Sequence, residues 1–531
     1  MPAAAKSRLR RFAWVLEALA LVGLGALAWS SPPPKFPPES VSEQQTPEGL
    51  ARGYAVGRKV PPDYFTVQNA DGRIFRIGYD TDGDGNPDEF VNLDEVPLAE
   101  SVHLVLVLDG MPHSVAEAYR KKGGLRLLHP PSRLVSVYPA FTDLALTDAF
   151  ASARCIAFEA VHFDHRLNQV VGTDLDYLSL RNESWARDCD YRAATLWDPF
   201  AYLLPQNVFE REMGEVRDLL ESKKRGMAVA YLVSTAGLAT REGEAGLLKI
   251  LDAVDRLCEE LVWRTRGHAK ITIFSDHGHT MTPCKRVDFK TFLTAKGWKP
   301  SVRLVGPRDV VQVEYGLVTT ALFAAKDQAG LAADLAQCPG VRFASYLEGA
   351  AAVEPRQARP ARVAVRASGG FATVERKGDA YRYQAAQGDP LGLLPVFAEL
   401  KAAGKLDAEG FAADGPLFEA TAQHIYPDAC DRLWRAFHGL ADEPADVIAD
   451  LDWGYFAGSQ PRSDLLPSVA STHGDLERIS STAVFMSTLG PAPPAFRNRD
   501  VPAVMRHLTG GPWPPVRTAI PEAREKAASA K

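Results

Sequence analysis

Residues 102–110 read VHLVLVLDG, and this stretch decides the fold class. Apart from His103, residues 102–108 are all Val or Leu, and they run directly into an acid and a glycine. A short apolar run of this kind is typical of a central strand that is covered on both faces. Residues 227–233 and 271–274 repeat the pattern, and residues 247–263 carry apolar residues at helical spacing. We therefore expect an α/β domain over residues 99–511.

Composition sets limits on the function. The chain has 531 residues, 46% of them hydrophobic, which excludes wholesale disorder, and it is too long for one ordinary domain. Its net charge is −6 and its pI is about 6.1, so nothing in the overall charge favours nucleic acid as a partner. Six cysteines are too few for a disulfide scaffold. Individual bridges are still conceivable, between Cys155 and Cys189 or among Cys258, Cys284, Cys338 and Cys430.

The N-terminus predicts export. A basic cluster precedes an apolar run at residues 12–29, which only Glu17 interrupts, and a Pro-rich stretch follows. A basic flank of this kind stays in the cytoplasm. Residues 1–30 are then a signal anchor or, with 26–28 (ALA) as the cleavage site, a signal peptide. Residues 31–48 are expected to be a tether. The rest of the chain would lie at the periplasmic face of the cell envelope, held by the N-terminal membrane helix or released.

Three further segments differ from the α/β pattern. Residues 49–98 are expected to form a small β-rich segment with an Asp-rich loop. Within the main domain, residues 285–460 are less regular and are expected to be an inserted or cap region, with hairpins at 363–383. Residues 512–531 are rich in Pro, Ala, Lys and Glu and are expected to be a disordered tail.

The Asp-rich loop resembles the front of a calcium loop, because acids stand at positions 1, 3, 5 and 9 and a glycine stands at position 6. The acids are Asp80, Asp82, Asp84 and Asp88. Position 12 is Val91, so the usual bidentate Glu is missing. The segment is either a structural calcium site or an Asp/Gly-rich hairpin turn.

Two predicted strands end in acid. Asp109-Gly110 follows the first strand, and Ser275-Asp276-His277-Gly278 follows residues 271–274. Open α/β sheets bind ligands outside the carboxyl ends of their strands, so two acids and a histidine at that edge could share one metal ion. Asp and His ligands suit zinc, and a carboxylate-rich site also admits manganese.

The order of the motifs adds specificity. After Asp109-Gly110 come residues 137–142 (VYPAFT), then 275–278 (SDHG) and 471–474 (STHG), with a weaker segment at 387–392 (QGDPLG). This series resembles the alkaline phosphatase superfamily, most closely its nucleotide pyrophosphatase/phosphodiesterase branch. The resemblance implies a mixed, mostly parallel sheet sandwiched by helices. It also implies that Asp109, Thr142, Asp276 and His277 hold one metal ion and that Thr142 is the nucleophile.

The family pattern breaks at the second metal. Where two-metal members carry Asp-x-x-Gly-His, this chain has Ala236 in place of the Asp and Thr240 in place of the His. Only His473 remains, and one histidine does not hold zinc alone. Glu242 or Glu244 is a conceivable substitute. Asn168 is a weak match to a substrate-binding Asn of the family.

Other polar residues near these motifs have no assigned role. His279 either supports the site or lies in a solvated loop. His162, Asp164 and His165 either line the pocket or lie on a surface loop.

Three interpretations remain. The first is an exported phosphoric ester hydrolase, a phosphodiesterase or phosphatase, with one metal ion and Thr142 as nucleophile. A membrane-anchored phosphoryl-group transferase would use the same residues. The second is a catalytically silent binding or scaffolding module, and the third is a two-metal enzyme with ligands from elsewhere. The substrate would be a phosphate-ester small molecule or an envelope component, selected by residues 285–460.

Overall fold

The computed structural model describes residue 36 and residues 38–57, 61–172, 183–348, 362–466 and 468–515. A central seven-stranded sheet organises the molecule, in the order β11-β12-β6-β13-β26-β7-β27. Its central strand β6 pairs in parallel with β12 on one side and with β13 on the other, and β26 runs antiparallel between β13 and β7. The expected mixed, mostly parallel sheet is confirmed. The strands are β6 (Val102–Leu108), β7 (Ser132–Val135), β11 (Tyr191–Arg192), β12 (Gly226–Leu232), β13 (Ala269–Phe274), β26 (Thr482–Ser487) and β27 (Ala495–Arg497).

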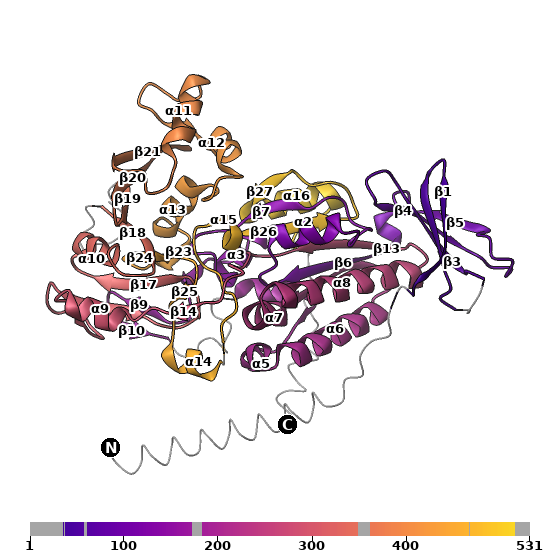
Figure 1. Ribbon diagram of the computed structural model, residues 1–531, viewed down its shortest axis with the longest axis horizontal. Coiled ribbons are helices and arrows are strands. Elements are labelled where there is room, and N and C mark those ends of the chain that lie inside the picture. The colour runs from indigo at the N-terminus through magenta and orange to yellow at the C-terminus, as the bar shows by residue number, and fades with distance from the viewer. Residues whose placement is uncertain are drawn as a thin grey trace, which may run out of the picture.

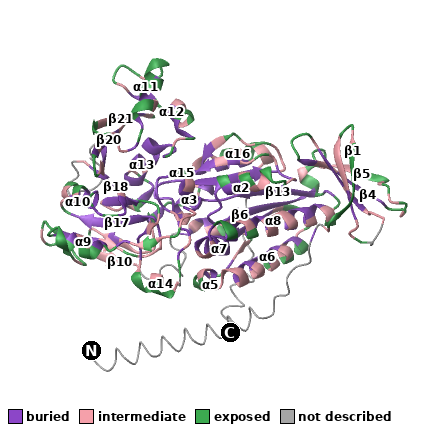
Figure 2. Ribbon diagram, viewed as in Figure 1, coloured by how far each residue is buried: buried purple, intermediate pink, exposed green. Residues whose placement is uncertain are grey.

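Helices cover both faces of this sheet because β6 is apolar on both faces (Figures 1 and 2). Leu104, Leu106 and Leu108 pack into one apolar cluster with α2 (His113–Lys121), α6 (Pro205–Ser222) and α8 (Glu244–Arg264). Val105 and Val107 pack into another with α3 (Thr142–Ala149), α5 (Asp198–Leu203) and α16 (Val501–Thr509). Alternate side chains of a strand point to opposite faces, so one continuous apolar run serves both layers.

The region predicted as an insertion contains a second sheet of nine strands, in the order β15-β16-β17-β24-β18-β19-β20-β21-β22. The hairpins expected at residues 363–383 are confirmed by the antiparallel strands β19, β20 and β21. The strands are β15 (Lys299–Pro300), β16 (Asp309–Val313), β17 (Thr320–Ala325), β18 (Val341–Leu347), β19 (Arg362–Ala367), β20 (Gly370–Lys377), β21 (Ala380–Gln387), β22 (Ala412–Ala413) and β24 (Val447–Leu451). The helices of this region are α9 (Phe289–Ala295), α10 (Gln328–Leu335), α11 (Leu394–Ala402), α12 (Asp414–Thr421) and α13 (Ala429–Phe437).

A five-stranded antiparallel sheet lies at the opposite end of the molecule (Figure 1). Its strands are β1 (Ser40–Thr46), β2 (Gly49–Tyr54), β3 (Tyr64–Gln68), β4 (Ile74–Tyr79) and β5 (Glu89–Asn92). Tyr79 fixes it to the core by donating a hydrogen bond to the carbonyl of Trp263 in α8, at 2.9 Å. The prediction of a tether over residues 31–48 is wrong for β1, because that segment pairs along its length with β2.

Further short strands and α-helices lie between these elements. They are β8 (Cys155–Ala157), β9 (His162–Asp164), β10 (Gln169–Val171), β14 (Lys285–Arg286), β23 (Ala441–Glu443), β25 (Tyr455–Phe456), α7 (Ser234–Glu242), α14 (Gln460–Leu465) and α15 (Arg478–Ser481).

Two predictions about the chain ends and the cysteines need correction. Trp513 is buried and donates a hydrogen bond to the carbonyl of Ala149, so the described fold extends past residue 511 into the stretch predicted to be a disordered tail. The conceivable bridges among Cys258, Cys284, Cys338 and Cys430 do not form, because the structure gives these four residues as thiols. The apolar run at 12–29 lies outside the described residues. Among the residues that are described, no helix combines the length and apolar character that a membrane crossing requires.

Candidate metal centre

The sheet brings the separate motifs to one edge. Asp109 follows β6, and Asp276 and His277 follow β13. Because β6 and β13 are parallel neighbours, their carboxyl ends lie side by side. Thr142 is the first residue of α3, and His473 lies in the segment that precedes α15. The register of two adjacent strands thus explains why acids far apart in the sequence meet.

His277 stands at the centre of this group. Its Nε2 atom lies 3.2 Å from Thr142 Oγ1, 3.2 Å from Asp276 Oδ2 and 3.6 Å from Asp109 Oδ1. Its Nδ1 atom is 3.0 Å from the carbonyl oxygen of Gly278. A carbonyl only accepts, so Nδ1 of the neutral ring carries the proton and Nε2 presents a lone pair to the carboxylates and the threonine.

In each of the two carboxylates, one oxygen accepts hydrogen bonds from other groups of the protein. Asp276 Oδ1 accepts backbone N–H groups from Gly110 and His277, both at 3.0 Å, and Asp109 Oδ2 accepts the hydroxyl of Tyr231 at 2.5 Å. The other oxygens, Asp109 Oδ1 and Asp276 Oδ2, are buried and have no hydrogen-bond partner among the described residues. Ligand atoms of Asp109, Asp276 and His277 all lie within 4.8 Å of one another. This donor set fits zinc or manganese, because two unpaired anionic oxygens and an imidazole lone pair converge.

Burial shifts the pKa of each group toward its neutral form. Burial, and next the neighbouring Asp276, raises the pKa of Asp109 well above its usual value, and burial raises that of Asp276. Burial lowers the pKa of His277 to about 4 and that of His473 to about 3. Two adjacent buried carboxylates repel each other when both are ionised, and a bound cation would offset that repulsion.

A pH prediction follows for the protein kept in chelator. Because the folded pKa of Asp109 is raised, the folded state holds a proton that the unfolded state releases above about pH 4. The contribution of Asp109 therefore lowers the free energy of unfolding of the wild type as pH rises from about 4 through the folded pKa of this carboxyl group. The Asp109→Asn variant should gain stability over the wild type progressively across that range. Denaturant unfolding at several pH values measures the difference. The buried histidines, whose pKa values are lowered, act with the opposite sign in both proteins.

An Asp109→Asn variant that loses stability relative to wild type as pH rises would contradict this electrostatic account. Adding zinc to both proteins supplies the control. It should stabilise the wild type more than the variant, since the variant has lost one anionic ligand.

A second group of possible ligands adjoins the first. The ring of His473 stacks on that of His277, with centroids 3.7 Å apart, and its Nδ1 lies 2.9 Å from the carbonyl of Ala140. His279 is buried, and its Nδ1 lies 3.0 Å from Ser471 Oγ. Ligand atoms of His277, His279 and His473 also lie within 4.8 Å of one another. The sequence left open whether His279 supports the site, and the structure places it beside the predicted ligands.

The positions where the family pattern fails supply no ligand. Ala236 and Thr240 are buried in α7, and the Thr240 carbonyl accepts the N–H of Ala470 at 2.7 Å. Glu242 forms an ion pair with Lys249 at 2.6 Å. The structure therefore does not bring the conceivable substitute Glu242 into the metal group.

Sequence reasoning missed three residues that shape the site. Asp143 follows Thr142 directly, accepts the indole N–H of Trp185 at 3.1 Å, and has its pKa raised by burial to about 6. Tyr231 on β12 orients Asp109. Asn498 is buried and donates through Nδ2 to the carbonyls of Asp276, at 3.2 Å, and Ala145, at 3.3 Å. Asn498 thus joins α3 to the turn that carries Asp276. No local sequence pattern predicts such a contact.

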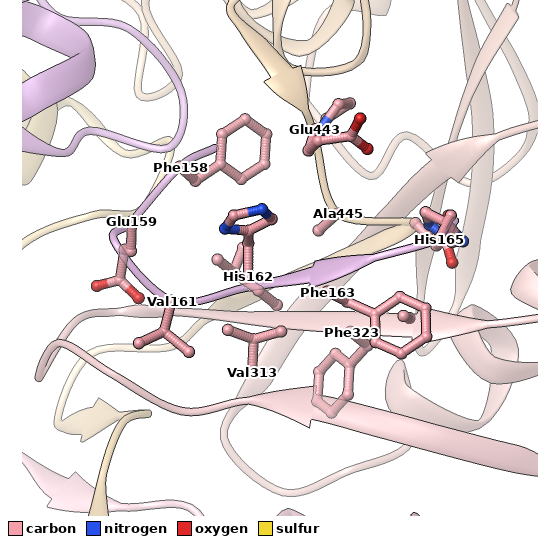
Figure 3. A pocket seen from close by; sticks show the side chains of 14 residues that line it. Phe158, Glu159, Val161, His162, Phe163, His165, Val313, Phe323, Glu443 and Ala445 are labelled. Carbon is pink, nitrogen blue, oxygen red and sulfur yellow. The ribbon is translucent and has the colours of Figure 1, made fainter. Parts of the chain in front are cut away.

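Other predicted polar residues lie elsewhere. Asn168 sits after β9 and makes two hydrogen bonds to the backbone of Leu304, so its amide stabilises a loop contact. His162 points into a separate pocket, between Phe158 and Val313 (Figure 3). His165 pairs with Asp446 at 3.2 Å. The structure does not bring these residues into the metal group.

The Asp-rich loop connects β4 to β5. Ligand atoms of Asp80, Asp82 and Asp88 lie within 4.8 Å of one another, and Asp84 is not in that group. Asp80 accepts the backbone N–H groups of Gly83 and Gly85. Val91, at position 12, belongs to β5 and pairs with Ile77. The segment is thus an Asp/Gly-rich hairpin turn that also gathers three carboxylates.

Comparison with known proteins finds no sequence match and a weak structural likeness. No family model matches the chain, and no curated protein does. Murine ectonucleotide pyrophosphatase/phosphodiesterase 5 is similar over 79% of this chain and 97% of its own, with 13% identity and a TM-score of 0.41. Its inactive variant in complex with AMP covers the same shares, with 10% identity and a TM-score of 0.41. The human protein covers 79% of this chain and 96% of its own, with 13% identity and a TM-score of 0.40. A likeness of this size establishes neither family nor activity.

Proposed function

We propose that this protein is a metal-dependent phosphoric ester hydrolase, a phosphodiesterase or phosphatase, with Thr142 as the nucleophile. One observation carries the proposal. Two buried carboxylate oxygens without hydrogen-bond partners, on Asp109 and Asp276, face the lone pair of His277 Nε2 beside the hydroxyl of Thr142. A carboxylate pair buried for structural reasons alone is normally satisfied by hydrogen bonds.

The position of Thr142 suits attack on phosphorus. As the first residue of α3 it stands where backbone N–H groups have no acceptor inside the helix, and the helix dipole favours an anion there. The phosphoryl oxygens of a substrate would therefore be held by first-turn N–H groups. Thr142 Oγ1 is then aligned by its contact with His277 Nε2, at 3.2 Å.

The reaction is a double displacement. The Thr142 Oγ1–P bond forms, the P–O bond to the leaving alcohol breaks, the hydroxyl proton is released to water, and the leaving oxygen takes up a proton from water. A water molecule then attacks phosphorus, the Thr142 Oγ1–P bond breaks, and Thr142 regains a proton. A cation held by Asp109, Asp276 and His277 would supply a lowered hydroxyl pKa and compensation for the charge on the phosphoryl oxygens.

Hydrolysis of aryl phosphates tests this function. Full-length protein, assayed with a bis-aryl phosphate diester and with an aryl phosphate monoester, should turn over at least one of them with zinc or manganese. Turnover should stop in chelator and return when the metal is restored. The Asp109→Asn variant serves as the matched control, since it keeps the shape of the side chain and removes an anionic ligand. Zinc or manganese binding without turnover of either substrate would favour the silent binding module.

Two further proposals accompany the function. We place the protein at the cell envelope, exported under the direction of its N-terminal basic and apolar segments, where a phosphate-ester small molecule or an envelope component would be its substrate. We also propose that the loop with Asp80, Asp82 and Asp88 takes a structural calcium ion.

A further inference from the structure

Arg432 is a buried arginine on α13, in the region predicted as an insertion, with 2% of its surface exposed. Its guanidinium group donates hydrogen bonds to backbone carbonyls. Nη2 donates to Val137 at 3.0 Å, and Nη1 donates to Leu476 at 2.8 Å and to Pro427 at 3.1 Å. Burial lowers the pKa of Arg432 to about 10, so the group stays charged at neutral pH. Taking a cation out of water is unfavourable, and these bonds offset part of that penalty.

Two of the three carbonyls belong to segments that carry residues of the site. One lies in residues 137–142, here called the nucleophile segment, which ends at the proposed nucleophile. The other lies in residues 473–476, here called the histidine segment. The two segments also meet directly, because the N–H of Ala140 donates to the carbonyl of Gly474 at 3.0 Å. The buried arginine therefore joins them at a second point.

The same helix also holds the helix that begins at the nucleophile. Arg435 lies one turn after Arg432 on α13, and its two terminal nitrogens donate to the two oxygens of Asp148, at 2.7 and 2.8 Å. Asp148 belongs to α3, whose first residue is Thr142. A paired contact of this kind fixes orientation as well as distance. Both ends of the path through Thr142 are thus attached to α13.

Acids at the start of α13 reach the metal side of the site. Asp428, directly before the helix, pairs with Arg497 at 2.6 Å, and Asp431 pairs with Arg499 at 2.7 Å. Between these two arginines stands Asn498, whose amide donates to the backbone of the turn after β13. The turn with the proposed metal ligands is therefore supported from the same helix.

We propose that Arg432 is a positioning residue for phosphoester hydrolysis, which sets the place of the nucleophile relative to the metal group. The proposal rests on the proposed function and deepens it. The metal ligands come from the turns after β6 and β13, whereas the contacts of Arg432 lie on other segments. The distance from Thr142 to the cation therefore depends on how the nucleophile segment is held. A displacement of about 1 Å can slow such a reaction about 100-fold.

Steady-state hydrolysis by the zinc-loaded, full-length protein tests the proposal. In Arg432→Met, kcat should fall about 10–100-fold, while KM changes by less than about threefold and the zinc content stays that of the wild type. Arg432→Lys keeps the charge and should recover part of the loss, since one amino group replaces the fork of the guanidinium. Arg382→Met is the matched control, because Arg382 lies in the same inserted region and pairs with Glu375 at 2.7 Å. Its kcat should equal that of the wild type.

Inhibition by orthovanadate separates positioning from stability. Vanadate takes five ligands, as phosphorus does under attack, whereas inorganic phosphate resembles the product. In Arg432→Met, the inhibition constant of vanadate should rise by about the factor by which kcat falls, and that of phosphate should change by less than about threefold. A variant that is only less stable would leave both constants unchanged. If thermal unfolding shows that Arg432→Met does not fold, Arg432→Lys takes its place, with a smaller change expected in the same direction.

Amide hydrogen exchange gives a readout that does not depend on activity. Peptides that cover the nucleophile segment should exchange about tenfold faster or more in Arg432→Met than in the wild type, and peptides that cover β6 should not change.

The outcomes separate this proposal from the proposed function. If both Arg432 variants keep kcat and the vanadate constant within about threefold of the wild type, Arg432 does not position the nucleophile. A loss of kcat that only follows a loss of zinc would also overturn the proposal. If the wild type hydrolyses neither aryl phosphate, the proposed function fails instead. Faster exchange in Arg432→Met would in that case still support the claim that Arg432 holds the nucleophile segment.

Discussion

The Thr142→Ala variant is expected to lose phosphoester hydrolysis by on the order of 10³-fold or more while it still folds and binds zinc. The methyl group of alanine leaves no atom to form the bond to phosphorus. Asp109, Asp276 and His277 all remain to hold the cation. The loss should appear in kcat, because the substitution leaves unchanged the first-turn N–H groups of α3, which we propose hold the phosphoryl oxygens.

Two variants make this test specific. Thr142→Ser keeps a hydroxyl at the same position and should retain measurable turnover. Thr147→Ala removes another hydroxyl from α3, one that contacts Cys155 Sγ at 3.3 Å, and should leave hydrolysis close to the wild type. If Thr142→Ala hydrolyses the substrate within tenfold of the wild type, Thr142 is not the nucleophile.

The Asp276→Ala variant is expected to lose hydrolysis to a similar extent, on the order of 10³-fold or more, together with the metal ion that Asp109, Asp276 and His277 would hold. Asp276 has two tasks in the structure. Its Oδ1 atom holds the N–H groups of Gly110 and His277, which fixes the two turns against each other, and its Oδ2 atom faces His277 Nε2. Alanine removes both the anionic ligand and the contact that positions the turn of Asp109.

Asp276→Asn separates the two tasks, because it keeps an oxygen for the backbone contacts and lacks the charge. This variant should fold like the wild type but bind zinc more weakly than the wild type does. Asp143→Asn is the matched control. Asp143 is a buried carboxylate next to Thr142 that contacts Trp185, outside the metal group. Its substitution should leave the metal content unchanged. Zinc content and initial hydrolysis rates, measured on one preparation of each variant, show whether Asp276 acts as an anionic ligand. Unchanged zinc binding in both Asp276 variants would exclude Asp276 as a ligand.

The parts of the site that the sequence predicts are those set by local patterns. A continuous Val/Leu run before Asp109 identifies a central strand, and a second apolar run before Asp276 identifies another strand. Parallel strands in such a sheet end at the same edge, so periodicity predicts that both acids lie at that edge. The pairing of β6 with β13, which brings the two acids together, comes from the structure. The alternating pattern at residues 363–383 likewise predicts the hairpins that the structure contains.

The parts that the sequence does not predict depend on contacts between distant segments. The nine-stranded sheet places β24 between β17 and β18, more than 100 residues away along the chain. The strand β1 is polar and exposed, and only its pairing with β2 makes it a strand. Asn498 reaches Asp276 across more than 200 residues. Burial of His279 follows from the path of the segment that carries Ser471, which no periodicity encodes.

Anomalous diffraction from crystals grown with zinc shows directly whether Asp109 and Asp276 bind a metal ion. We expect an anomalous peak about 2.0–2.2 Å from Asp109 Oδ1 and Asp276 Oδ2, with Thr142 Oγ1 beside it. Crystals of Asp276→Ala should lack this peak. If both of these carboxylate oxygens remain without a bound ion at saturating zinc, they are not metal ligands and the proposed hydrolase mechanism is wrong.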